Sequence, residues 1–147
     1  METILSTGNI YHVFNKSIAG FKIFNHSSDF WRMNRGLSYY QADNPKIRFA
    51  RYILNEKNQD KHNFCLDCEN LVDIIAYCIM PTHIHLVLRQ LKDKAISIFM
   101  NNLLNSYTRY FNTKYKRKGP LWEARFKRVL VMTDEQLLHL TRYVHLN

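Results

Sequence analysis

Two histidines separated by a single residue have the clearest potential for chemistry in this sequence. His83 and His85 begin the segment HIHLVLR, which is typical of a β-strand. Side chains two residues apart in a strand point to the same face, so both imidazoles project together with Cα atoms about 7 Å apart. The pair could converge on one divalent cation, and imidazole suits Mn, Zn, Ni or Cu better than Mg. The alternative is a pair of ordinary polar residues on the outer face of a half-exposed strand.

A cation held by two imidazoles needs further ligands, and the C-terminal segment offers candidates from another element. The sequence TDEQ at 133–136 forms a capping box, which predicts a final helix that runs through Tyr143. At about 100° per residue, Tyr143 and Asn147 lie one helical turn apart on the same face. A phenol and an amide are therefore presented side by side.

Tyr143 is one of nine tyrosines, and three others also follow the two histidines. Tyr107 lies on the apolar stripe of its predicted helix, which indicates a core residue. Tyr110 and Tyr115 lie among cationic residues, where their rings could stack on nucleobases. Tyr143 is distinguished from these by the amide four residues later.

The charge of the chain points to a polyanionic partner such as nucleic acid. There are 21 Lys and Arg residues against 12 Asp and Glu, a formal charge of +9, and the pI is near 9.6. Between positions 109 and 128, eight cations accompany one acid, Glu123. Interleaved aromatic residues could add base stacking. The alternative is a solvated helix end, with Trp122 and Phe126 in the core. The residues predicted to contact nucleic acid are Arg109, Lys114, Lys116, Arg117, Lys118, Trp122, Arg125, Lys127 and Arg128.

The elements that must position these residues follow from the hydrophobic periodicity. Their order is that of a split βαβ arrangement with one extra helix. We predict an α+β fold of the ferredoxin-like (RRM-like) class: an antiparallel sheet with helices on one face, an open second face, and a C-terminal helix that carries Tyr143. The predicted strands are 10–18, 71–79, 83–89 and 126–132, and the predicted helices are 28–40, 45–55, 93–116 and 133–143.

The length and composition fit one domain that spans residues 1–147. A chain of this size with 46% apolar residues can bury one ordinary core. There is no secretory leader, and no apolar run approaches the roughly 20 residues of a membrane span, so we expect a soluble, cytoplasmic protein. The three cysteines, Cys65, Cys68 and Cys78, are then expected to be reduced thiols.

Several of these segments together resemble one enzyme family. The segment YCIMPTHIHLVL (77–88) resembles the histidine–hydrophobe–histidine motif of the single-tyrosine HUH transposases, an IS200-like group. GPLWEARFKR (119–128) and YVHLN (143–147) resemble the later motifs of the REP-associated tyrosine transposase branch, and YHVFN (11–15) resembles its first strand. The match spans nearly the whole chain, and three ordered motifs are more specific than the histidines alone.

The resemblance implies a set of roles for these residues. It implies that residues 1–147 form a single HUH transposase-like nuclease domain, in which His83, His85 and Asn147 bind a divalent metal ion, Mg²⁺ or Mn²⁺. Tyr143 would be the nucleophile that forms a 5′-phosphotyrosine intermediate during cleavage and rejoining of DNA. Single-stranded DNA or a DNA hairpin is the implied partner, and the resemblance also allows for a homodimer.

Two other classes of protein share some of these features. A catalytically silent DNA- or RNA-binding module of ferredoxin-like fold would also be basic and aromatic, but the RNP signature of RNA-recognition domains is absent. Such a module would not require His83, His85 and Tyr143 to meet. Replication initiators and relaxases of the wider HUH class would share the chemistry, but their chains are generally larger.

Overall fold

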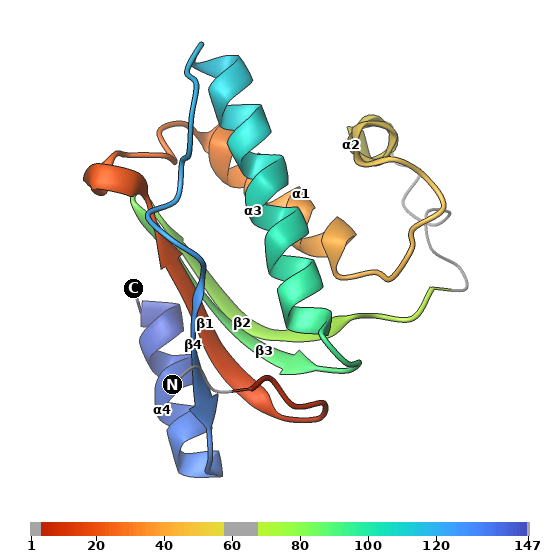
Figure 1. The fold of residues 1–147 in the computed structure, drawn as a ribbon, viewed down its shortest axis with the longest axis vertical. Helices are drawn as coiled ribbons and strands as arrows, with labels where there is room; N and C mark the ends of the chain where they lie inside the picture. The colour runs from red at the N-terminus through yellow and green to blue at the C-terminus, as the bar shows by residue number, and fades with distance from the viewer. Residues whose placement is uncertain (1–3, 58–67, 147) are drawn as a thin grey trace.

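The computed structural model of the protein describes residues 4–57 and 68–146. The four strands form one antiparallel sheet in the order β2-β3-β1-β4, which is the ferredoxin-like arrangement. The predicted α+β fold is therefore confirmed. The elements in chain order are β1 (Ile10–Lys16), the 3-10 helix η1 (Ile18–Gly20), α1 (Ser27–Tyr40), α2 (Phe49–Lys57), β2 (Val72–Met80), β3 (His83–Gln90), α3 (Ala95–Lys114), β4 (Lys127–Val131) and α4 (Asp134–Leu146) (Figure 1).

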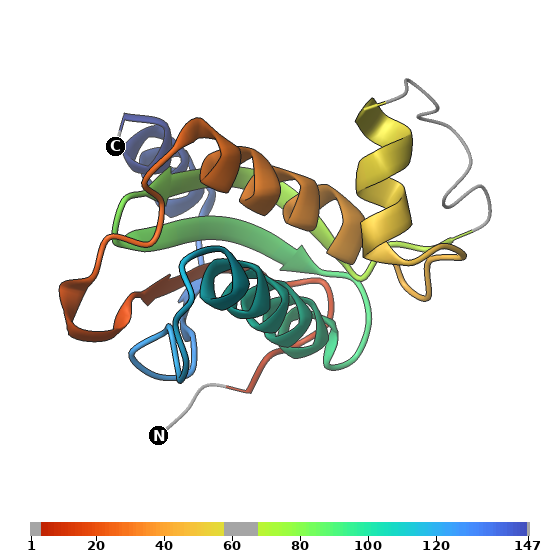
Figure 2. The same ribbon diagram turned by 90° about the horizontal axis from the view of Figure 1, so that it is seen from above.

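The sheet separates two layers of helices. α1 and α3 lie on one face of the sheet, and α4 lies on the other (Figure 1). α2 packs on the end of α1, away from the strands (Figure 2). The main core lies between the sheet and the α1/α3 layer, and β3 contributes Ile84, Leu86 and Leu88 to it. Because side chains alternate along a strand, His83 and His85 point to the opposite face, as predicted.

The second face of the sheet is partly covered by α4, so the expectation of a fully open face is wrong. The apolar stripe of α4 must be buried, and the other face of the sheet is already occupied by α1 and α3. Val144 is only 1% exposed. The small second core joins Leu137, Leu140 and Val144 of α4 to Ala76, Cys78 and Val87 of the sheet.

Some element boundaries differ from the prediction. β1 ends at Lys16, two residues before its predicted end, because the chain turns through η1, in which Ala19 has a left-handed conformation (φ 53°). α2 begins at Phe49 and not at Pro45: the chain bends at residues 46 and 47, and the Ile47 carbonyl accepts a hydrogen bond from the Tyr39 hydroxyl at 2.6 Å. α4 extends to Leu146, three residues beyond its predicted end.

The prediction of reduced thiols is wrong for one cysteine. Cys68 is disulfide-bonded, whereas Cys78 is buried in β2 and is not part of a disulfide. Cys65 lies outside the described residues. An odd number of cysteines argues against a framework of several disulfides, but it does not argue against a single disulfide.

None of the helices within residues 4–57 and 68–146 combines the length and the hydropathy that a membrane span needs.

Candidate functional site

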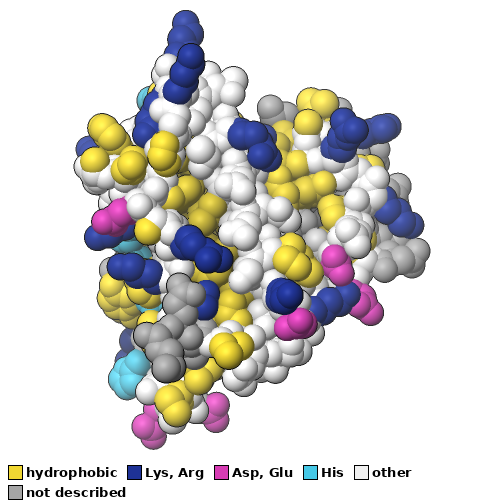
Figure 3. Space-filling model, viewed as in Figure 1, with side chains coloured by type: hydrophobic (Ala, Val, Ile, Leu, Met, Phe, Trp, Pro, Cys, Tyr) yellow, Lys and Arg dark blue, Asp and Glu magenta, His cyan; other side chains and the backbone are white. Residues whose placement is uncertain are grey.

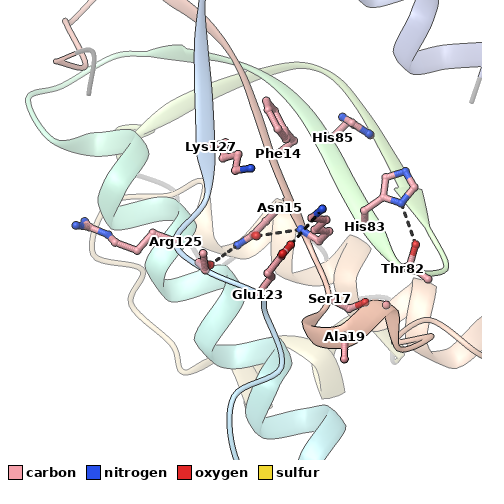
Figure 4. A pocket seen from close by; sticks show the side chains of 13 residues that line it. Phe14, Asn15, Ser17, Ala19, Thr82, His83, His85, Glu123, Arg125 and Lys127 are labelled. Carbon is pink, nitrogen blue, oxygen red and sulfur yellow. Dashed lines mark hydrogen bonds and ion pairs between the residues drawn. The ribbon is translucent and has the colours of Figure 1, made fainter. Parts of the chain in front are cut away.

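The two histidines of β3 lie side by side near the start of that strand. Their ring centroids are 5.0 Å apart with an interplanar angle of 87°, and both residues are half-buried. Nδ1 of His83 is 3.0 Å from Oγ1 of Thr82 in the preceding turn (Figure 4). The turn itself is fixed because the Pro81 carbonyl accepts a hydrogen bond from the Ile23 amide at 2.8 Å. The fold thus presents two imidazoles from a well-anchored hairpin.

A third histidine, which the sequence analysis did not single out, belongs to the same group. His12 lies on β1, and its Nε2 is 3.0 Å from Nδ1 of His85. The two rings are stacked, with centroids 5.2 Å apart. Alternation along β1 places His12 on the same face as Phe14, and the register pairs Phe14 with His85. The strand order was needed to find this contact, because β1 and β3 are neighbours in the sheet but more than 60 residues apart in the chain.

His12 and His85 are both half-buried, and this affects the protonation of their rings. Burial, together with the neighbouring imidazoles of His12 and His83, lowers the pKa of His85 to about 4. Burial also lowers the pKa of His12. His12 and His85 are therefore neutral at pH 7, and a neutral imidazole keeps the lone pair that binds a cation.

Tyr143 approaches this group from α4. Its ring centroid is 6.0 Å from that of His85, with an interplanar angle of 84°, and the residue is 52% exposed. The next residue, Val144, anchors the helix in the small second core, so the position of Tyr143 is set by packing. The structure thus brings Tyr143 and the two histidines of β3 together; Asn147 lies outside the described residues. We call His12, His83, His85 and Tyr143 the histidine cluster.

A cavity of about 550 Å³ opens beside the histidine cluster. His83 and His85 form one wall, and Phe14 of β1 forms part of the floor (Figure 4). Two of the predicted nucleic-acid contacts, Arg125 and Lys127, line the opposite side. The cavity therefore combines an aromatic surface, cationic side chains and the two imidazoles.

The other predicted cations lie mostly around the C-terminal end of α3, where Lys and Arg side chains project from the top of the molecule (Figure 3). Lys116 and Lys118 are exposed, and so is Arg109 within α3. The guanidinium of Arg117 donates to the Pro120 carbonyl at 2.6 Å, so part of its donor capacity is used within the loop. Arg128 of β4 lies with its guanidinium carbon 5.9 Å from the centre of the Phe126 ring.

The structure corrects the assignment of Trp122 to base stacking. Trp122 is 9% exposed and its indole donates to the Leu104 carbonyl at 3.3 Å, and Phe126 is also buried. Tyr107 is a core residue, as predicted, with 2% exposure. Burial raises the pKa of the Tyr107 phenol, which donates to the Ile23 carbonyl. These rings have no face open to a nucleobase in the structure.

Lys114, Tyr110 and Tyr115 converge on one buried carboxylate, that of Asp29 in α1. Lys114 Nζ is 2.7 Å from Oδ1 of Asp29, the Tyr110 hydroxyl donates to Oδ1 at 2.9 Å, and the Tyr115 hydroxyl donates to Oδ2 at 2.7 Å. Burial alone would raise the pKa of Asp29, but these hydrogen bonds and that from the Asn25 amide hold it well below its usual range. We call Asp29, Tyr110, Lys114 and Tyr115 the Asp29 cluster.

Comparison with known proteins identifies relatives of the chain. The family model of IS200-like transposases matches residues 44–147. A Haemophilus influenzae protein described as a REP-associated tyrosine transposase is 28% identical over an alignment of 112 residues, and the match covers 68% of this chain and 63% of that protein. The chain therefore spans less than two thirds of the length of that relative.

A solved structure gives a similar result for the fold. The structure of a REP-associated tyrosine transposase bound to a REP hairpin superposes with a TM-score of 0.63 at 11% identity, covering 100% of this chain and 70% of that chain. At that identity the likeness concerns the fold alone. Because the family model covers more than half of the chain, this protein belongs to the IS200-like transposase family, within which it is similar to the REP-associated tyrosine transposases.

Proposed function

We propose that this protein cuts and rejoins single-stranded DNA, with Tyr143 as the nucleophile and with His83 and His85 as ligands of a divalent metal ion. The observation that carries the proposal is the approach of Tyr143 to the histidine pair, with 6.0 Å between the ring centroids of Tyr143 and His85. These side chains come from a helix and a strand that are far apart in sequence. A binding module without catalysis would not need these side chains to meet.

The donor set fits a divalent cation. Nδ1 of each ligand candidate already has a partner, Thr82 for His83 and His12 for His85, which leaves both Nε2 atoms for a metal. Two imidazole nitrogen donors favour Mn²⁺ over Mg²⁺. Within residues 4–57 and 68–146, no three His, Cys, Asp or Glu side chains form a metal-binding group. The family resemblance implies the Asn147 amide as the third protein ligand, and we expect DNA or water to complete the shell.

When bound, the cation would stabilise negative charge on the scissile phosphate. Tyr143 Oη attacks phosphorus, and the new Oη–P bond forms as the bond to O3′ breaks. The phenol loses its proton, and the departing O3′ takes up a proton to become a 3′-hydroxyl. The fragment on the 3′ side of the scissile phosphate stays on Tyr143 through its 5′-phosphate, as a 5′-phosphotyrosine. Rejoining is the reverse reaction with another 3′-hydroxyl.

The cavity beside the histidine cluster is the place we assign to the nucleotide next to the scissile phosphate. Its volume of about 550 Å³ lies within the roughly 300–1,000 Å³ of small-molecule sites. Phe14 offers a surface for stacking, while Arg125 and Lys127 offer charge to the phosphates. A paired duplex would hinder entry of one strand, so we expect an unpaired segment. The REP hairpin bound by the structural relative supports a hairpin next to that segment.

A covalent-adduct assay tests the proposal. Hairpin-flanked single-stranded DNA, labelled on the 3′ side of the scissile phosphate, is incubated with the protein and Mn²⁺ and then separated under denaturing conditions. We expect a labelled protein–DNA adduct that is lost with a chelator and in Tyr143→Phe. Tyr77→Phe is the matched control, because Tyr77 of β2 is also exposed (41%). An adduct that persists in Tyr143→Phe would reassign the nucleophile.

A further inference from the structure

His12 is the member of the histidine cluster to which the proposed chemistry gives no task. It lies on β1, where the register pairs it with Val87, two residues beyond His85 on β3. Its Nε2 is 3.0 Å from Nδ1 of His85, and both rings are half-buried. A contact of this length between two nitrogens is a hydrogen bond, which needs one donor and one acceptor.

The direction of this hydrogen bond decides whether His85 can bind a cation. If Nδ1 of His85 were the acceptor, the proton of the neutral ring would be on Nε2, and that nitrogen would have no lone pair for a metal. If Nδ1 of His85 donates to Nε2 of His12, then Nε2 of His85 is free to bind. Only the second direction agrees with His85 as a ligand, and it requires an acceptor at position 12.

The other histidine of the pair has an equivalent arrangement. Oγ1 of Thr82 is 3.0 Å from Nδ1 of His83, and a hydroxyl oxygen can accept the proton of that ring. The Nδ1 atom of each ligand candidate thus lies next to an oxygen or nitrogen atom that can accept its proton in a hydrogen bond. His12 does not act as a third ligand in this geometry, because it flanks His85 on the side away from His83 and the described residues form no three-residue metal group.

We propose that His12 is a positioning residue: its Nε2 accepts the Nδ1 proton of His85 and so orients His85 to bind a divalent cation through Nε2. This inference rests on the proposed function, in which His83 and His85 hold the cation. The effect of such supporting residues on metal affinity is about 10- to 100-fold.

Mn²⁺ binding to the full chain in the absence of DNA tests the inference without using activity. Free Mn²⁺ is followed by electron paramagnetic resonance during a titration of the wild type, His12→Leu and His12→Gln. Leu removes the acceptor, whereas the Gln side-chain oxygen can replace Nε2. We expect about 10- to 100-fold weaker binding in His12→Leu and near-complete rescue in His12→Gln. Equal affinity of wild type and His12→Leu, or equal loss in both variants, would overturn the inference.

A second measurement covers the case in which His12→Leu fails to fold. Nitrogen-15 NMR of the histidine side chains in the wild type reports the tautomer of His85 directly, and we expect the proton on Nδ1. A proton on Nε2 would overturn the inference. Wild-type protein that binds no Mn²⁺ at all would overturn the metal site of the proposed function as well, so the two failures can be told apart.

Discussion

The Asp29 cluster and the histidine cluster lie on opposite faces of the sheet and differ in how their polar atoms are satisfied. Both oxygens of the buried Asp29 accept hydrogen bonds, from side chains of the cluster and from the amides of Asn25 and His26. In the histidine cluster the Nδ1 atoms have partners, but within residues 4–57 and 68–146 Nε2 of His83, Nε2 of His85 and the Tyr143 hydroxyl have none.

This difference indicates what each cluster contributes. A buried polar group with all its hydrogen bonds made contributes to the stability of one conformation, and it has no atom left for a ligand. A cluster beside a cavity that has unused donor and acceptor atoms contributes less to stability than a fully hydrogen-bonded one. Its unused atoms can bind a ligand. We therefore expect substitutions in the Asp29 cluster to affect folding, and substitutions in the histidine cluster to affect catalysis.

The largest effect is expected for Tyr143→Phe. Loss of the hydroxyl removes the proposed nucleophile, so the rate of adduct formation should fall by about a thousandfold or more. Because the side chain is 52% exposed and its hydroxyl makes no hydrogen bond within the described residues, the free energy of unfolding should change by less than about 0.5 kcal/mol. Single-turnover cleavage and urea denaturation measure the two quantities. A large loss of stability would contradict the division between the clusters.

For Asp29→Asn we expect a loss of stability with little change in cleavage. The amide cannot accept the same hydrogen bonds or pair with Lys114, so the free energy of unfolding should fall by about 3 kcal/mol, the low end for a broken buried pair. We use the low end of this range because the ammonium of Lys114 is partly exposed and can be solvated by water when the pair is broken. Urea denaturation measures the loss, and cleavage per folded molecule should stay close to that of the wild type.

Asp73→Asn is the control for this substitution. The Asp73 carboxylate is 44% exposed and lies 3.7 Å from Arg89, and such surface ion pairs contribute less than about 1 kcal/mol. If Asp29→Asn is no more destabilising than Asp73→Asn, the Asp29 cluster does not have the structural role assigned to it.

The two clusters should also respond to different ranges of pH. The pKa of His85 is lowered to about 4, whereas an unfolded histidine titrates near 6.5. Between these values the unfolded chain binds more protons than the folded one, so the free energy of unfolding falls as the pH falls. The lowered pKa of His12 has the same effect on the free energy of unfolding. Asp29 also has a lowered pKa, but its carboxylate loses its contribution to stability only below about pH 4.

For the metal-free protein we expect a loss of about 1–2 kcal/mol between pH 6.5 and 4.5, after allowance for the partial exposure of His85. Urea denaturation at several pH values measures it. The slope should be shallower in His85→Gln and unchanged in Asp29→Asn. If the free energy of unfolding depends on pH equally steeply in His85→Gln and in the wild type, the histidine cluster is not the source of this pH dependence.

Local patterns in the sequence predicted the parts of the site that depend on one element. Alternation along β3 placed His83 and His85 on one face, and the capping box at 133–136 located the helix that carries Tyr143. The prediction that Tyr107 is a core residue was also right, because its stripe of apolar neighbours repeats at helical spacing. These features are set by the geometry of a single strand or helix.

Contacts between distant segments could not be predicted in this way. The cations around Tyr110 and Tyr115 suggested base stacking, but their hydroxyls bond to Asp29, more than 80 residues earlier. The contact of His12 with His85 depends on the order of the strands. The side of the sheet that α4 covers depends on which face α1 and α3 leave free. In each case the deciding partner lies in another element.

The smallest expected effect concerns two lysines near the end of α3. Lys118 is exposed and forms no ion pair within the described residues, whereas Lys114 Nζ is held 2.7 Å from Asp29. We expect Lys118→Gln to weaken DNA binding by about two- to fivefold and to reduce the slope of log affinity against log salt by about 1, since one phosphate contact and its released counterion are lost.

Lys114→Gln is the matched comparison for this last experiment. A lysine that already neutralises a buried carboxylate is not free to contact a phosphate, so its loss should leave the salt slope nearly unchanged and lower the stability instead. Fluorescence anisotropy of labelled hairpin DNA at several salt concentrations measures the slope. If both substitutions reduce it equally, the ammonium of Lys114 leaves Asp29 when DNA binds, and the Asp29 cluster then belongs to the DNA-binding surface.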